Sequence, residues 1–131
     1  MNLYITAFYA SLLALCYFYL SALVIKERRA GAIGIGDGGN TTLQRLIRAH
    51  GNFSEYVPIC LVMLATFEVN AEMNGVAHAL GASLLFGRLL HAYGLRLHAG
   101  ASWQRLAGML LTFAAMILLA CFNLYVLYWT V

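Results

Sequence analysis

The sequence has few charged residues, and this scarcity excludes most soluble folds. Of its 131 residues, 10% are Asp, Glu, Lys or Arg and 63% are hydrophobic. Soluble domains carry about 25% charged and about 45–50% apolar residues. A chain of this length has too small an interior to bury such an apolar excess. We therefore expect the lipid bilayer to solvate most of it, as one domain over residues 1–131.

Cysteine and positive charge are also scarce. The three cysteines, Cys16, Cys60 and Cys121, each lie within an apolar run. An odd number without metal-ligand spacing argues against a disulfide framework, and we expect no metal site. The thiols are expected to pack as small apolar side chains. The net charge is +3, and no basic stripe stands clear of the apolar runs, so nucleic acid is not expected as a partner.

Long apolar runs predict an all-α integral membrane protein, a multi-pass four-helix bundle. The expected spans are residues 3–25, 42–70, 75–97 and 102–129. The first is too long for a signal peptide and has no basic residue before it. At 1.5 Å per residue it reaches roughly 34 Å, enough to cross the hydrocarbon core. Thr41 or Thr42 is the expected N-cap of the second helix.

The positions of the basic residues predict the orientation. Glu68 and Glu72 lie near the second connection, which has no Lys or Arg. Cytoplasmic connections of membrane proteins carry an excess of Lys and Arg, so the first and third connections are expected to be cytoplasmic and both termini to lie on the outer side. The basic residues near those two connections are Lys26, Arg28, Arg29, Arg45, Arg48, Arg96 and Arg105.

A glycine-rich segment fits a nucleotide-binding pattern that we reject. Gly34-x-Gly36-x-x-Gly39 matches the dinucleotide fingerprint, but that fingerprint has meaning only between a strand and a helix of a βαβ unit. Here it follows a predicted membrane helix. Residues 31–40 are instead expected to form a flexible loop, whose glycine-rich backbone can order over a bound anion.

Several polar residues fall inside the predicted spans. Charged groups there cost about 2.5–3.5 kcal/mol each on insertion scales, so they mostly face the bundle interior, pair, or do chemistry. On the second helix, Arg48, Asn52, Glu55 and Tyr56 follow i, i+4, i+7, i+8 spacing and share one face. His50 lies on another side of that helix.

The number of residues between a side chain and the short second connection gives its depth in the membrane. This count places Glu55 level with Arg88, and Asn52 level with His91. Arg105, at the start of the fourth helix, is expected at the level of Arg48. These residues predict a polar cleft with a cationic mouth, suited to a hydrophilic anion presented to a lipid-soluble partner. The alternative is an ion pair between Glu55 and Arg88 that only fixes helix packing.

These residues carry a family resemblance. The segment Arg48-Ala49-His50-Gly51-Asn52-Phe53-Ser54-Glu55-Tyr56-Val57-Pro58 resembles the Arg-x-His-x-Asn-x-x-Glu signature of the MAPEG family, the membrane-associated proteins in eicosanoid and glutathione metabolism. Residues 87–94, with Arg88 and His91, are similar to a second signature of that family. The run Gly36-Asp37-Gly38-Gly39 resembles its small bacterial branch, which implies the bacterial inner membrane.

The resemblance implies a homotrimer with sites between subunits and glutathione as co-substrate. By position, glutathione would be bound by Arg48, Asn52, Glu55 and Tyr56, and the site lined by Arg88 and His91. His50 would reach the glutathione of the next subunit, and Arg28 or Arg29 would hold a glutathione carboxylate.

The resemblance also implies a catalytic residue. In catalytic members an arginine at the start of the fourth helix stabilises the glutathione thiolate, and Arg105 is the candidate, with Arg96 as the alternative. The sequence departs from leukotriene C4 synthase, which has tyrosines where this chain has His91 and Leu95. Leu95 removes a hydroxyl from the site, which implies fewer glutathione contacts.

The sequence is compatible with three functions. The first is a glutathione transferase or peroxidase acting on hydrophobic electrophiles or lipid hydroperoxides. The second is a non-catalytic lipid-binding or scaffold member of the same family. The third, a small multidrug transporter, ranks last because that class needs a carboxylate in its first span, and residues 3–25 carry no charge. The partners expected are glutathione, a hydrophobic small molecule or lipid, and the membrane; the second substrate is left open.

Overall fold

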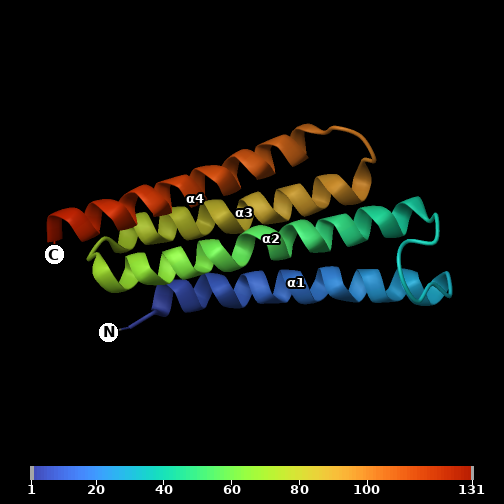
Figure 1. Ribbon diagram of the computed structural model, residues 1–131, viewed down its shortest axis with the longest axis horizontal. Helices are drawn as coiled ribbons and strands as arrows, with labels where there is room; N and C mark the ends of the chain where they lie inside the picture. Colours follow the sequence, from blue (N-terminus) through green and yellow to red (C-terminus); the bar gives the residue numbers. More distant parts are fainter. Residues whose placement is uncertain (1, 131) are drawn as a thin grey trace.

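The computed structural model describes residues 2–130, and it forms a bundle of four long helices (Figure 1). Residues 1 and 131, the ends of the predicted domain, lie outside the described residues. The helices are α1 (Tyr4–Ala30), α2 (Thr41–Asn70), α3 (Asn74–Leu97) and α4 (Trp103–Thr130). The all-α prediction is confirmed.

The ends of two helices add detail to the sequence prediction. Helix α1 ends at Ala30, so it continues beyond the predicted apolar span, which ends at residue 25. Arg28 and Arg29 in its last turn favour this extension, since cations stabilise a helix C-terminus. The N-cap of α2 is Asn40, whose Oδ1 accepts hydrogen bonds from the Thr42 and Leu43 amides at 2.9 and 3.0 Å. The prediction of a threonine cap was wrong, and asparagine is the stronger capping residue.

The helices pack so that α1 and α4 lie on opposite sides of the α2–α3 pair. Helix α1 contacts α2 and α3, and α4 contacts α3 and α2. Both termini lie at one end of the bundle, and the α1–α2 and α3–α4 connections lie at the other (Figure 1). The core contains fully buried Leu13, Leu64, Phe67, Leu84 and Leu119.

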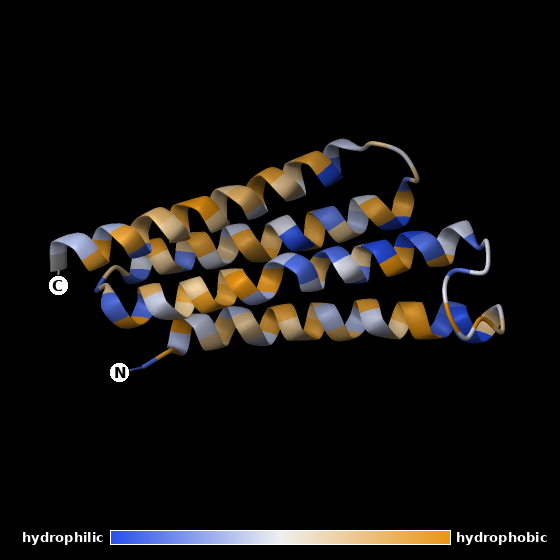
Figure 2. Ribbon diagram, in the orientation of Figure 1, coloured by the Kyte–Doolittle hydropathy of each residue, from blue (hydrophilic) through white to orange (hydrophobic). Residues whose placement is uncertain are grey.

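Three helices, α1, α2 and α4, are long and apolar enough to cross a membrane. This confirms the prediction of a membrane protein. Helix α3 has 24 residues, a similar length, but its buried set includes Arg88 and His91, which lower its hydropathy. The hydrophilic residues of α2 and α3 gather in the half of the bundle nearest the α1–α2 connection (Figure 2).

The end that carries the termini is held by contacts to α1. The Glu68 carboxylate accepts hydrogen bonds from the Ile5 and Thr6 amides, both at 2.7 Å. These amides are in the first turn of α1, where a helix has no internal acceptors for its N–H groups. The Tyr9 hydroxyl donates to the His78 carbonyl at 2.9 Å. Together these bonds attach the start of α1 to α2 and α3.

Side chains of α1 form hydrogen bonds to the α1–α2 connection. Arg28 Nη1 donates to the Gly36 carbonyl at 2.8 Å, and Asn40 Nδ2 donates to Glu27 Oε1 at 3.0 Å. Gly36 and Gly38 have positive φ values, which glycine adopts without strain. The glycines therefore serve a tight turn that side chains of α1 fix, and the segment follows a helix, as expected when the nucleotide reading was rejected.

Candidate functional site

A buried arginine lies at the centre of the polar residues. Arg88 of α3 is 2% exposed, and its Nη1 donates to Asn52 Oδ1 of α2. Its Nε donates to Thr112 Oγ1 of α4 at 2.8 Å, and its Nη2 lies 3.2 Å from the Met109 sulfur. Within residues 2–130 these hydrogen-bond partners are all neutral, so none of them supplies a counter-charge to the guanidinium.

Arg88 does not pair with Glu55. Its Nη1 bonds to Asn52, and its guanidinium also lies over the Tyr56 ring. Asn52 and Tyr56 are about one turn apart on α2, on either side of Glu55 in the sequence, so the predicted level of Glu55 with Arg88 stays a prediction. The alternative of a structural Glu55–Arg88 ion pair was wrong, because Glu55 pairs with Arg48.

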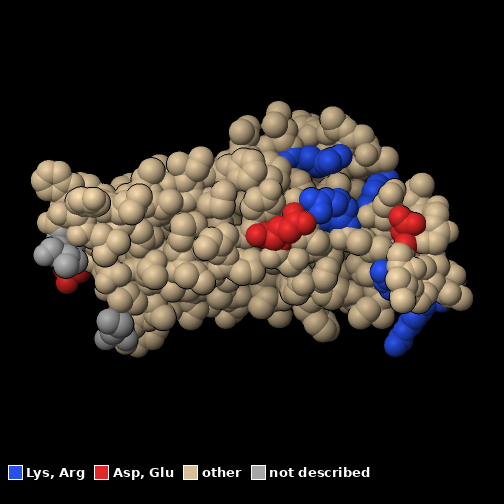
Figure 3. Space-filling view, viewed as in Figure 1, with Lys and Arg blue, Asp and Glu red and all other residues tan. Residues whose placement is uncertain are grey.

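Glu55 pairs with Arg48 on its own helix. Arg48 Nη1 and Nη2 donate to Glu55 Oε1 and Oε2 at 2.9 and 3.2 Å, a bidentate pair across two turns. The two side chains are 57% and 48% exposed. Figure 3 shows acidic and basic side chains side by side on the surface of the bundle, well away from its ends. Such exposure is unusual for charges on a membrane-spanning helix.

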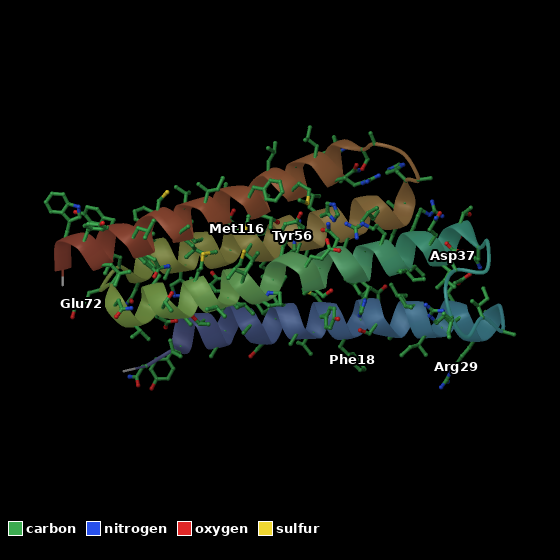
Figure 4. All side chains as sticks on the ribbon, in the orientation of Figure 1. Phe18, Arg29, Asp37, Tyr56, Glu72 and Met116 are labelled. Atoms are coloured by element: carbon green, nitrogen blue, oxygen red, sulfur yellow. The ribbon has the colours of Figure 1, made fainter. Side chains whose placement is uncertain are left out.

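Tyr56 joins this pair to the buried arginine. The Arg88 guanidinium carbon lies 5.5 Å from the centroid of the Tyr56 ring, within the range of a cation–π contact. Tyr56 also packs edge-on against Phe113 of α4, with ring centroids 5.5 Å apart. Figure 4 shows Tyr56 at the middle of the bundle, between α2 and α4. The polar stripe of α2 therefore borders α4.

His91 lies within reach of several positive charges. It is 6% exposed, and Arg88, Arg105 and Arg48 all interact with it electrostatically. Its backbone packs against Gly108 of α4, where a side chain would not fit. The structure thus brings together the polar residues of α2, α3 and the start of α4, as the sequence predicts.

Arg105 lies in the first turn of α4, at the edge of this group. Its Nη1 donates to the Gly100 carbonyl at 2.7 Å, and its side chain packs against Gly94 of α3. Arg96, the alternative, lies on the α1 side of α3, where its Nη1 donates to the Tyr19 hydroxyl at 3.1 Å. The structure therefore associates Arg105, and not Arg96, with the polar group around His91. Leu95 is buried in the core.

Two predicted residues lie apart from this group. His50 faces α1, where its Nε2 is 3.0 Å from Ser21 Oγ and its ring stacks on Tyr17 with centroids 4.5 Å apart. Its position on another side of α2 is as expected. Arg29 is exposed at the end of α1 and points away from the bundle (Figure 4). One protomer alone does not bring these two side chains to Arg48.

Sequence reasoning named Arg105 on α4 but missed the close contact between α3 and α4. Thr112 is fully buried and accepts from Arg88, and Gly87 and Gly108 let the α3 and α4 backbones meet closely. The signal was present, because Gly108 and Thr112 are four residues apart in an apolar run. Small residues at this spacing mark close helix–helix contacts in membranes.

Among residues 2–130, no three His, Cys, Asp or Glu side chains are grouped to hold a metal ion. The site instead contains guanidinium groups, an amide and a phenol, next to the apolar ring of Phe113. Such a set can bind an anion through charge-assisted hydrogen bonds.

Comparison with known proteins identifies the family. The model of the MAPEG family matches residues 6–125. The chain belongs to the MAPEG family. It is 38% identical over 125 residues to the inner membrane protein YecN of Escherichia coli K12, covering 95% of this chain and 94% of the relative. The protein of the same name from Escherichia coli O6:H1 matches to the same extent. Membership confirms the resemblance seen in the sequence.

Proposed function

We infer that this MAPEG protein is a membrane-bound glutathione transferase or peroxidase. The observation that carries the inference is Arg88, a buried guanidinium whose hydrogen bonds within the described residues go to neutral groups. A charge inside a membrane protein is costly, and residues that keep one usually serve a ligand or a partner charge. Glutathione, which carries two carboxylates and a thiol, is an anion of the right kind.

The surrounding residues fit the binding of such a peptide. Arg48 and Glu55 offer one charge of each sign on the exposed face of α2, and Tyr56 adds a phenol whose ring lies beside Arg88. The carboxylates of glutathione would bind arginine, and its amino group would bind Glu55. Asn52, Arg88 and His91 would line the inner wall.

Arg105 is the proposed catalytic residue. A free thiol has a pKa of about 8.5, so most of it is protonated at pH 7. A guanidinium held beside the sulfur favours the thiolate, and lowering the thiol pKa by two units corresponds to about 2.7 kcal/mol. The proton leaves to water, and the thiolate attacks the electrophile directly. In the peroxidase reaction, two glutathiones reduce one hydroperoxide to an alcohol and water and become a disulfide. No protein nucleophile is needed.

The assembly proposed is a homotrimer in the bacterial inner membrane. The exposed Arg48–Glu55 pair supports it, because a second copy packed on α2 would remove these charges from lipid. The next copy would bring its own His50 and Arg29 toward the site. All four helices would then cross, with both termini on the outer side. The location is supported by the relatives, which are named inner membrane proteins.

A non-catalytic lipid-binding or scaffold protein is the second candidate. It is favoured by one observation: Arg48 and Glu55 bond to each other, and Arg105 bonds to the Gly100 carbonyl. These groups are satisfied within one protomer. A scaffold would use them for packing alone.

The test is a titration of glutathione into the purified protein in detergent, with heat release and the ultraviolet band of the thiolate recorded together. Arg105→Ala and the control Lys26→Ala are measured in parallel, since Lys26 is exposed and outside the proposed site. We expect the parent and Lys26→Ala to bind glutathione with a thiolate signal. Arg105→Ala should bind without that signal.

Other outcomes separate the candidates. Glutathione binding without thiolate in the parent would retain the site and remove the proposed chemistry. The absence of heat at millimolar glutathione would contradict the transferase and favour the scaffold.

A further inference from the structure

A cavity lies on the opposite side of the α2–α3 pair from α4. It has a volume of about 660 Å³ and is formed mainly by α1 and α3, with Phe53 of α2 at its floor. This volume is within the range of roughly 300–1,000 Å³ typical of ligand sites. The walls are apolar and aromatic and include Leu15, Leu20, Phe86 and Leu89. We call this cavity the α1–α3 groove.

The groove has a cation at one end. Arg96 lies in its lining, with Nη1 donating to the Tyr19 hydroxyl at 3.1 Å and the guanidinium carbon 5.6 Å from the Tyr19 ring centroid. Both contacts are to a neutral side chain, and Arg96 is exposed. The lining includes two arginines, Arg88 and Arg96, and no carboxylate. The Arg88 guanidinium is buried and bonded to Asn52 and Thr112, so Arg96 is the exposed cation of the groove. A ligand that matches this pattern is apolar along its length and negative at one end.

The length of the groove agrees with half a bilayer. Phe86 and Arg96 are ten residues apart on α3, about 15 Å along the helix axis. The hydrocarbon core of a bilayer is about 30 Å thick, so one leaflet contributes about 15 Å. Phe86 and Tyr93 are 62% and 54% exposed, which leaves the groove open sideways to lipid.

We propose that the α1–α3 groove binds one acidic phospholipid per protomer, with an acyl chain along Leu15–Leu20 and Phe86–Leu89 and the phosphate on Arg96. Tyr19 positions the guanidinium through its hydroxyl and ring. The groove shares one residue, Arg88, with the site proposed for glutathione. The phospholipid proposal rests on Arg96 and does not depend on glutathione binding.

Cys16 lines the groove and reports on its occupancy. Cys121 is exposed and is removed as Cys121→Ala, while Cys60 is fully buried. The protein in this background is placed in bilayers of phosphatidylcholine alone or of phosphatidylcholine with phosphatidylglycerol. The rate of Cys16 alkylation is measured with an uncharged, membrane-permeant maleimide, which the surface potential does not attract or repel.

We expect alkylation to be about fivefold slower with phosphatidylglycerol, the ratio expected from one arginine–lipid charge contact. Arg96→Gln should abolish this difference, and Arg96→Lys should retain it, which shows that a loss in the glutamine variant comes from charge and not from misfolding. Lys26→Gln removes a charge at the same end of the bundle without touching the groove, and it should retain the difference.

Three results would overturn the proposal. The first is equal alkylation in the two lipids, and the second is a difference that survives Arg96→Gln or disappears equally in Lys26→Gln, which indicates bulk surface charge. The third is a Cys16 that stays unreactive in every bilayer and in detergent, which shows that the groove is closed to small molecules.

Discussion

At the scale of single residues, the arginines of the polar site are held in two different ways. Arg88 is buried and hydrogen-bonded to Asn52 and Thr112, whereas Arg48 is exposed and paired with Glu55. Hydrogen bonds to a charged group contribute about 1.5–3 kcal/mol each. Arg88 therefore ties α2 and α4 to α3 whatever it binds. Arg48 and Glu55 depend on each other for charge balance.

This dependence predicts the behaviour of variants of the Arg48–Glu55 pair. Glu55→Gln leaves Arg48 without a counter-charge on a membrane-spanning helix, and we expect a loss of about 2–3 kcal/mol in stability. Arg48→Gln should cost a similar amount. The double variant removes both charges, so it should be more stable than either single variant. Thermal unfolding of the three proteins in lipid nanodiscs measures these differences. Strictly additive losses would show that the pair is not coupled.

At the scale of helices, the contact of α3 with α4 is set by glycine. A Cβ at Gly108 would lie 2.6 Å from the Gly87 carbonyl oxygen and 2.6 Å from the His91 amide nitrogen. Both atoms belong to the backbone of α3 and cannot rotate away. The close approach is what lets Thr112 reach Arg88 and lets His91 lie against α4.

Gly108→Ala should therefore separate α3 from α4. We expect a loss of about 1–3 kcal/mol, typical of overpacking, and a lower midpoint of thermal unfolding. Gly75→Ala is the matched control, because Gly75 is also helical and has open space around it. Alanine is the better helix former, so this control should be neutral or stabilising by up to about 1 kcal/mol. Equal midpoints for the two variants would contradict the role of Gly108.

The helices could be predicted from the sequence, but the pairing of their side chains could not. Apolar runs gave the helix bounds to within a few residues, and the spacing of Arg48, Asn52 and Tyr56 gave one shared face. Arg88 bonds to Asn52, and Glu55 bonds to Arg48. This choice of partners depends on how the side chains pack between the helices, which residue spacing does not contain. The α1–α3 groove escaped prediction because it depends on how α1 packs against α3.

At the scale of the whole molecule, positive charge is confined to one half of the bundle. Figure 3 shows every visible Lys and Arg toward the end that carries the α1–α2 and α3–α4 connections, and an acidic side chain at the opposite end. Such a distribution favours insertion with the basic end on the cytoplasmic side. The α2–α3 connection would then face outward.

Labelling in spheroplasts tests this orientation. In a background without the native cysteines, Glu72→Cys reports on the α2–α3 connection and Gly34→Cys on the α1–α2 connection, since both positions are exposed. A membrane-impermeant maleimide should label Glu72→Cys in intact spheroplasts. Gly34→Cys should react only after lysis. The reverse pattern would invert the orientation, and labelling of both before lysis would contradict the membrane-spanning arrangement.

The bond of Glu68 to the start of α1 has a consequence for biosynthesis. The first turn of α1 is made more than sixty residues before Glu68, so the Ile5 and Thr6 amides have no carboxylate acceptor while α1 enters the membrane. They gain it only when α2 has crossed and its far end has reached the same surface. The α1–α2 hairpin is thus the shortest part of the nascent chain in which the Ile5 and Thr6 amides can form these hydrogen bonds.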